Sequence, residues 1–101
     1  MLEKEVENRL KKPVESMGGL CLKLVCPAFT GVPDRMILLP GAHVVFVETK
    51  APGKKERPRQ EYVHGLFRRL GFTVYNTVDT PAKVAVVVED CRRLVYDSKG
   101  I

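Results

Sequence analysis

The sequence has little of several residue types that mark common protein classes. It contains no tryptophan, only 2 histidines and only 3 cysteines. Cys21, Cys26 and Cys91 fit neither a disulfide framework nor the ligand spacing of a zinc site, so we expect reduced thiols that pack as small hydrophobes. No Ser/His/Asp or Cys/His arrangement for nucleophilic catalysis is evident. The composition therefore gives no support for a disulfide-stabilised, zinc-binding or triad-based protein.

Long apolar runs and phosphate-binding glycine loops are also missing. No apolar stretch reaches the roughly 18 residues that indicate a membrane span. The first residues, Met1 to Glu5, are charged and lack the apolar core of a signal peptide, so we expect a cytoplasmic protein. Neither a GxGxxG motif nor a P-loop occurs, and no nucleotide cofactor is expected. A length of 101 residues predicts one domain, residues 1–101.

Acidic residues are fewer than basic ones, 12 against 17, which gives a formal net charge of +5 and favours a polyanionic partner. The basic residues gather after position 50, in a stretch whose prolines and glycine predict a loop. A solvated surface is the usual meaning of such a run. Its place directly after the acidic motif described next favours contact with a DNA backbone instead. The candidate DNA-binding residues are Lys54, Lys55, Arg57 and Arg59.

The acidic motif is Asp34, a spacer, and then Glu48-Thr49-Lys50 at the end of an apolar run. Two carboxylates can hold a divalent cation, and a lysine can position an attacking water. Side chains alternate along a strand, so Glu48 and Lys50 share one face. If the hairpin loop is residues 40–42, Asp34 lies directly opposite Glu48, near enough for both carboxylates to reach one ion. A loop one residue longer would remove Asp34 from that position.

These charges also have a simpler interpretation, as a solvated pair at a sheet edge in which Lys50 forms a salt bridge without chemistry. They follow four consecutive apolar residues, Val44 to Val47, which is the pattern of a strand buried on both faces. Charges at the end of such a strand are costly unless they are used or paired. We therefore favour the catalytic interpretation.

Hydrophobic periodicity predicts helices over residues 2–17, 59–70 and 82–93, and strands over 20–27, 36–39, 44–50 and 72–77. Pro13 lies inside the first helix, which either bends there or ends near Lys11 and restarts. The expected apolar stripe of the second helix comprises Tyr62, Val63, Leu66, Phe67 and Leu70. The valine-rich run 84–88 is equally consistent with a strand, so the last helix is the least determined element.

The motifs Gly31-x-Pro33-Asp34, Val47-Glu48-Thr49-Lys50 and Gln60 together resemble the VRR-NUC domain, the virus-type replication-repair branch of the PD-(D/E)XK nuclease superfamily. The resemblance runs from about Glu3 to Thr77, and the size is similar to that of stand-alone phage and bacterial members. It implies an α/β fold with an αβββαβ core, to which we add a C-terminal helix. It also implies Mg²⁺- or Mn²⁺-dependent hydrolysis of DNA, and homodimers that act on branched DNA such as four-way junctions during DNA repair.

The same resemblance implies roles for further residues. The backbone carbonyl of Thr49 is a third candidate metal ligand beside Asp34 and Glu48, and Gln60 would hydrogen-bond a ligand, water or phosphate in the site. An additional acid comes from the first helix, where Glu3 and Glu7 compete. Related branches have a tyrosine four residues after the glutamine, where this chain has His64, and a structural histidine is favoured there over a DNA contact. A phage-encoded member would act in the host cytoplasm.

Three functions follow as hypotheses. The first is a metal-dependent DNA endonuclease in which Asp34, Glu48, Lys50, Gln60 and one or both of Glu3 and Glu7 form the catalytic site. The second is an inactive nuclease fold that only binds DNA, and the third is a basic regulator or assembly factor. Metal-dependent cleavage separates the first from the other two.

Overall fold

The structure is a computed structural model that describes residues 2–50 and 55–99. The elements follow in the order α1 (Glu3–Ser16), β1 (Leu20–Lys23), β2 (Arg35–Leu39), β3 (His43–Thr49), α2 (Pro58–Arg69), β4 (Thr73–Val78) and α3 (Pro81–Lys99). This αβββαβ core with a C-terminal helix confirms the predicted α/β fold class. None of the helices in the described part of the chain is long and apolar enough to cross a membrane.

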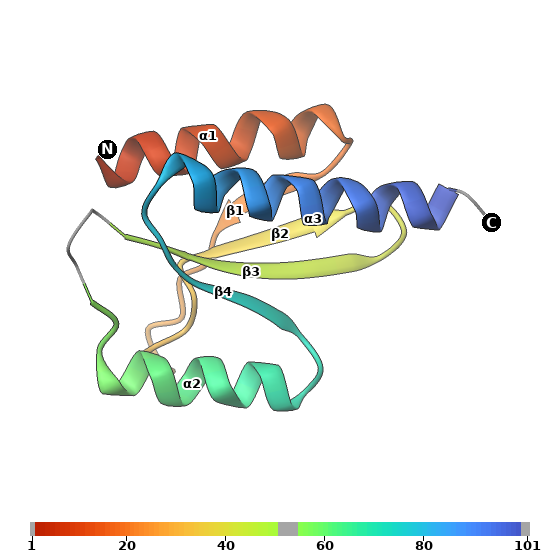
Figure 1. The fold of residues 1–101 in the computed structure, drawn as a ribbon. Helices are drawn as coiled ribbons and strands as arrows, with labels where there is room; N and C mark the ends of the chain where they lie inside the picture. Colours follow the sequence, from red (N-terminus) through yellow and green to blue (C-terminus); the bar gives the residue numbers. More distant parts are fainter. Residues whose placement is uncertain (1, 51–54, 100–101) are drawn as a thin grey trace.

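The four strands form one sheet in the order β1-β2-β3-β4. The first three strands are antiparallel neighbours, and β4 is parallel to β3. A parallel pair needs a crossover connection, and α2 supplies it. Helices α1 and α3 lie side by side over one face of the sheet, and α2 covers the other (Figure 1). The fold therefore has three layers, with the sheet in the middle.

The β2–β3 hairpin has the predicted register. Leu39 pairs with His43, so the loop is residues 40–42, and Arg35 pairs with Val47. Gly41 adopts a φ of 85° in this loop, a left-handed conformation that glycine takes without strain. The same register, extended by one step, places Asp34 opposite Glu48.

Apolar side chains fill both spaces between the layers. The larger core lies between the sheet and the pair α1 and α3, and contains Val6, Leu10, Val14, Ile37, Leu39, Val45, Val47, Val78, Val84, Val87, Val88, Cys91 and Val95. On the opposite face, the ring of Phe46 meets Phe67 and Phe72 edge to face, at centroid distances of 4.9 and 5.6 Å. The alternation along β3 thus directs Phe46 and Glu48 toward α2, and Val45 and Val47 toward α1 and α3.

The structure corrects several expected elements. Helix α1 continues through Pro13 to Ser16, which excludes the second of the two alternatives, an end near Lys11 followed by a restart. Pro13 lies near the C-terminal end of the helix, where the lost backbone donor interrupts only the last turns. Strand β1 ends at Lys23 rather than Pro27, because β2 pairs only with Leu20 to Lys23.

Two helices also differ from expectation in the residues that they bury. In α3, Val84, Val87, Val88, Cys91 and Val95 are buried at helical spacing, which decides the valine run in favour of a helix and extends it to Lys99. In α2, Tyr62 and Leu70 are 56% and 75% exposed, so the expected apolar stripe is wrong at these two positions. Val63 is buried as predicted, and His64, which was not part of the predicted stripe, is buried beside it.

The cysteines have the expected free thiols. Cys91 is in the core and Cys21 packs against it. Burial raises the pKa of the Cys91 thiol to about 11 and also raises that of Cys21.

Candidate active site

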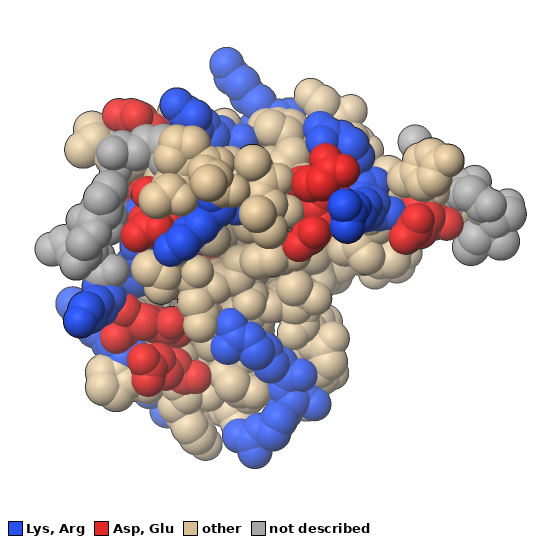
Figure 2. Space-filling model, in the orientation of Figure 1, with Lys and Arg blue, Asp and Glu red and all other residues tan. Residues whose placement is uncertain are grey.

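The sequence-predicted residues come together at the end of the sheet where β2 begins and β3 ends. Asp34 directly precedes β2, Glu48 and Thr49 are the last residues of β3, and Lys50 directly follows it. The first turns of α1 and α2 lie at this same end, on opposite faces of the sheet (Figure 1). Acidic and basic side chains alternate over the same end of the molecule in the space-filling view (Figure 2).

Asp34 is held by Thr49. The backbone N–H of Thr49 donates to Asp34 Oδ1 at 2.9 Å, and the Thr49 hydroxyl donates to Asp34 Oδ2 at 2.6 Å. Thr49 is fully buried, so water does not compete for these bonds. Sequence reasoning assigned Thr49 only a backbone carbonyl role and missed that its side chain orients the aspartate.

Glu48 is a buried carboxylate whose hydrogen-bond and ion-pair partners belong to the same site. Its side chain accepts hydrogen bonds from the Asp34 backbone N–H at 3.1 Å and from Gln60 Nε2 at 3.1 Å. Lys50 Nζ lies 2.7 Å from Oε2. Burial raises the pKa of Glu48, while the hydrogen bond from Lys50 opposes that shift. Lys50 and Gln60 thus hold a carboxyl group that is only 4% exposed, which is consistent with a functional residue.

An irregularity in the sheet lies beside Glu48. Val47 pairs with Tyr75, but Thr49 pairs with Val78, so β4 has an extra residue opposite Glu48. Thr77 has a φ of 49°, an uncommon value for a non-glycine residue. Bulges of this kind re-aim side chains and occur often beside active sites.

Gln60 connects α2 to the end of β3. It is the third residue of the helix, and its Oε1 accepts a hydrogen bond from the backbone N–H of Arg57 at 3.0 Å, which caps the helix start. The same oxygen accepts a bond from Lys50 Nζ at 3.3 Å, while its amide nitrogen donates to Glu48. Gln60 therefore fixes the positions of both charged groups at once.

Both competing acids of the first helix reach the site. Carboxylate oxygens of Glu3, Glu7 and Asp34 lie within 4.8 Å of one another, and Glu7 forms an ion pair with Arg35. Carboxylate oxygens are the ligands that Mg²⁺ and Mn²⁺ prefer, so this donor set fits such a cation. Glu48 is not a member of that group, although it binds the backbone of Asp34.

Two of the four candidate DNA-binding residues border a pocket of about 450 Å³ that is lined by Thr30, Gly31, Val32, Lys50, Arg57, Arg59 and Gln60. Arg57 and Arg59 line it directly, and Lys55 is exposed nearby in the chain. Lys54 lies outside the described residues. Cations from the basic segment and the lysine of the acidic motif therefore face one solvent-accessible pocket.

His64 is fully buried and does not face solvent, which confirms the structural interpretation. Its Nδ1 lies 2.6 Å from Glu56 Oε1 and 2.9 Å from Asn76 Oδ1. Arg68 also donates to Asn76 Oδ1, at 2.9 Å. The histidine thereby ties the segment before α2 to β4. One sequence signal pointed to this residue, namely its position four residues after Gln60.

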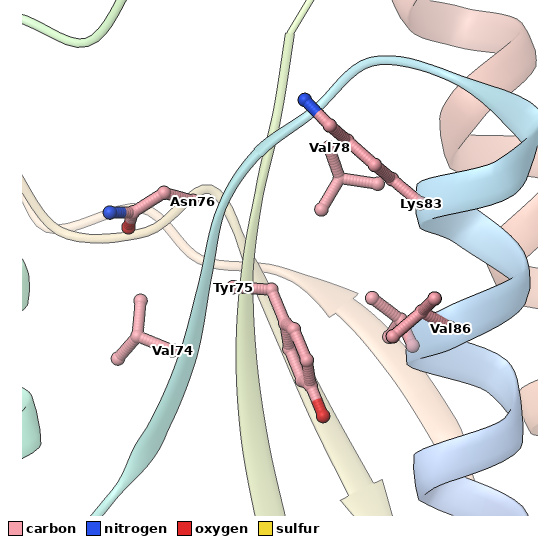
Figure 3. A pocket seen from close by; sticks show the side chains of 7 residues that line it. Val74, Tyr75, Asn76, Val78, Lys83 and Val86 are labelled. Carbon is pink, nitrogen blue, oxygen red and sulfur yellow. The ribbon is translucent and has the colours of Figure 1, made fainter.

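A second hollow, of about 320 Å³, lies between β4 and α3. Its lining is mainly valine, and it contains none of the predicted site residues. Tyr75 extends from β4 toward α3, whereas Val74 and Asn76 leave the other side of the strand (Figure 3). The Tyr75 hydroxyl donates to Asp90 at 2.6 Å, and burial raises its pKa. This hollow lacks the paired acids and lysine of the site at the end of β3.

Comparisons with known proteins point in the same direction. No family model matches the chain. Over 72 residues it is 42% identical to "Putative nuclease p44" of Acyrthosiphon pisum secondary endosymbiont phage 1, a match that covers 71% of this chain and 77% of that protein. A solved structure described as "VRR_NUC domain" superposes with a TM-score of 0.78 at 32% identity, and covers 86% of this chain and 94% of that one.

Proposed function

Because this chain belongs to the VRR-NUC family of nucleases, we propose that it is a metal-dependent endonuclease that hydrolyses phosphodiester bonds in branched DNA such as four-way junctions. The observation that carries the proposal is the network at the end of β3. One buried carboxylate, Glu48, contacts Lys50, Gln60 and the backbone of Asp34. A second carboxylate, that of Asp34, is oriented by two bonds from Thr49.

Asp34 and Glu48 would hold the cation, together with the Thr49 carbonyl and one or both of Glu3 and Glu7. A bound Mg²⁺ or Mn²⁺ supplies Lewis-acid polarisation of the phosphate and lowers the pKa of a coordinated water. The protein supplies rigidity. Because Thr49 and Gln60 already fix the two carboxylates, little reorganisation is needed when the substrate arrives.

Lys50 is the catalytic cation in this proposal. Its ammonium group lies between Glu48 and Gln60 and lines the pocket that Arg57 and Arg59 also face. A phosphate in that pocket would lie beside the Lys50 donor. Lys50 then orients the attacking water and stabilises the charge that develops on the phosphate oxygens. Gln60 is a positioning residue, because it acts through Glu48 and Lys50.

A homodimer suits the proposed substrate. One core of this size offers little surface for DNA, and a two-fold pair of sites matches a symmetric four-way junction. The net charge of +5 favours binding to the phosphate backbone. The proposed role of this activity is DNA repair in the cytoplasm. If the chain is phage-encoded, this is the cytoplasm of the host cell.

An inactive DNA-binding nuclease fold is the second candidate, and the Lys50–Glu48 pair at 2.7 Å is the observation in its favour, since a non-catalytic ion pair has the same geometry. Cleavage decides between the two. Purified protein is incubated with four-way junction, flap, single-stranded and linear duplex DNA in Mg²⁺, Mn²⁺ or EDTA. We expect cuts in the branched DNA with either metal and none in EDTA. Binding without cleavage under every condition would establish the second candidate.

A further inference from the structure

An exposed cluster of one cation and two aromatic rings lies beside the proposed active site. The Arg59 guanidinium carbon lies over the rings of Phe29 and Tyr62, 5.1 and 5.7 Å from their centroids. Phe29 and Tyr62 are 44% and 56% exposed. Each ring therefore has one part against the guanidinium and a large remaining area open to solvent. Phe29 and Tyr62 thus form an exposed aromatic pair around one arginine.

The cluster is held in place by contacts between the β1–β2 connection and α2. Arg59 Nε donates to the carbonyl of Thr30 at 3.2 Å, directly after Phe29. Gly31, with a φ of 91°, packs so closely on α2 that a Cβ there would lie 3.0 Å from the Arg59 side chain and backbone. The rings are thus presented in a fixed arrangement before any ligand binds, which lowers the entropic cost of binding.

Arg59 also connects the cluster to the site. It lines the same pocket as Lys50, Arg57 and Gln60. A ligand that rests on the rings can therefore place an anionic group in a pocket that contains three cationic side chains. A nucleotide has this combination of a flat base and a phosphate.

Pairing state decides which nucleotide can use such a surface. In a duplex, both faces of each base are covered by its stacked neighbours. An unpaired base has a free face, and aromatic side chains or arginine planes take it up with little regard to sequence. We propose that Phe29, Arg59 and Tyr62 form a stacking platform for an unpaired nucleobase of the DNA substrate, whose phosphate enters the pocket with Lys50 and Arg57. This inference rests on the proposed function, because it defines the substrate feature recognised beside the scissile phosphate.

The platform explains a preference for branched DNA without contacts that read sequence. Flaps, junction arms that open at the crossover and single strands all offer unpaired bases, and an intact linear duplex does not. The platform therefore predicts discrimination at the binding step, before any bond is cut.

The test measures binding without cleavage. Fluorescence anisotropy in EDTA compares wild type with Phe29→Leu and Tyr62→Leu on a blunt duplex, the same duplex with a single-stranded overhang, and a single strand. Leucine keeps an apolar side chain of similar size but removes the π face. We expect each variant to lose between about fivefold and 100-fold in affinity for the two DNAs with unpaired bases, and less than about twofold for the blunt duplex.

Two further variants sharpen the result. Tyr62→Phe keeps the ring and must keep wild-type affinity. Tyr96→Leu removes an aromatic side chain that is 73% exposed on α3, and must bind all three DNAs normally. A 2-aminopurine in the overhang reports stacking directly, and its fluorescence should be quenched by wild type and not by Tyr62→Leu.

Two outcomes overturn the platform. Equal losses on duplex and overhang DNA would show that the rings only brace the loop, and unchanged affinity would show that they contact no DNA. Both are independent of catalysis. A protein that binds overhang DNA through these rings but never cleaves it would refute the proposed nuclease activity and leave the platform intact.

Discussion

Substitution of Lys50 distinguishes a catalytic role of this side chain from a structural one. If it acts on the nucleophile or the developing phosphate charge, Lys50→Met should lower the single-turnover cleavage rate by on the order of 10²–10³. Folding, metal affinity and DNA affinity should largely survive. If Lys50 only pairs with Glu48, at 2.7 Å, the main effect is instead a loss of folding stability. Cleavage at saturating enzyme and metal isolates this step, and a rate within a few-fold of wild type would exclude Lys50 from the catalytic apparatus.

His64 stabilises the segment before α2 and has no part in the proposed catalysis. It is fully buried against Glu56, whose side chain is only 8% exposed. His64→Ala leaves the buried Glu56 side chain without its polar partner, which costs about 1–3 kcal/mol in the free energy of unfolding. Urea unfolding measures this loss. The double variant His64→Ala/Glu56→Gln should recover part of the stability, because an amide costs less to bury without a partner than a carboxyl group does.

The matched control for His64 is His43→Ala. His43 is partly exposed and bonds Ser98 rather than a carboxylate. If both histidine variants lose the same stability, the Glu56 pairing is not what makes His64 important.

For single residues, the sequence predicted which residues lie near one another better than it predicted the hydrogen bonds between them. The register prediction for Asp34 and Glu48 succeeded because a two-residue side-chain period and one short turn determine it. The orienting bonds from Thr49 and the burial of His64 were not predictable in the same way. They depend on how a loop, a helix and β4 meet in space, and no local spacing encodes that meeting.

At the scale of elements, the basic segment that leads into α2 is the proposed contact with the DNA phosphates. Replacing Lys54, Lys55, Arg57 and Arg59 with alanine should weaken duplex binding and flatten its salt dependence. Each lost phosphate contact lowers the slope of log K against log salt by roughly 0.9. Anisotropy titrations between about 50 and 200 mM salt test this.

The control for the basic segment replaces Arg92 and Arg93, exposed cations of α3 in the opposite layer, with alanine. Their removal lowers the net charge but should leave the slope nearly unchanged. If the slope is also unchanged when Lys54, Lys55, Arg57 and Arg59 are replaced, the basic segment does not contact DNA.

Element boundaries show what periodicity can and cannot determine. Strands β2, β3 and β4 and helix α2 begin within about two residues of the predicted positions, because Gly and Pro signals flank them. The valine run in α3 was ambiguous because valine favours strands, and only burial against α1 and the sheet decided it. Tyr62 was predicted to be buried because it is partly apolar and belongs to the apolar stripe of the helix. In the structure its ring is exposed and contacts Arg59 instead.

At the scale of the whole molecule, binding of Mg²⁺ or Mn²⁺ should raise the free energy of unfolding. Burial raises the pKa of Glu48 above its ordinary value of about 4.3. The metal-free folded protein then binds this proton more tightly than the unfolded chain, so its free energy of unfolding falls as pH rises from about 4.3 through the raised value. Mg²⁺ or Mn²⁺ offsets that loss, by about 2.7 kcal/mol at 100 times Kd, and its effect grows with pH as protons cease to compete.

Thermal unfolding with and without Mg²⁺, at several pH values, measures this linkage. Asp34→Asn keeps much of the shape of the side chain and removes the charge, so it should remove most of the metal-induced shift. A shift that is the same in wild type and Asp34→Asn, or that grows as pH falls, would contradict metal binding by these carboxylates.

The central claim is that Asp34 and Glu48 support cleavage rather than folding or DNA affinity, and one comparison tests it most directly. Single-turnover cleavage of a four-way junction in Mg²⁺ is measured for wild type, Asp34→Ala and Glu48→Ala, alongside junction binding in EDTA. We predict that both variants lose cleavage while binding is unchanged or tighter, because each substitution removes a negative charge near the phosphates. Wild-type Mg²⁺-dependent turnover in either variant would contradict the account.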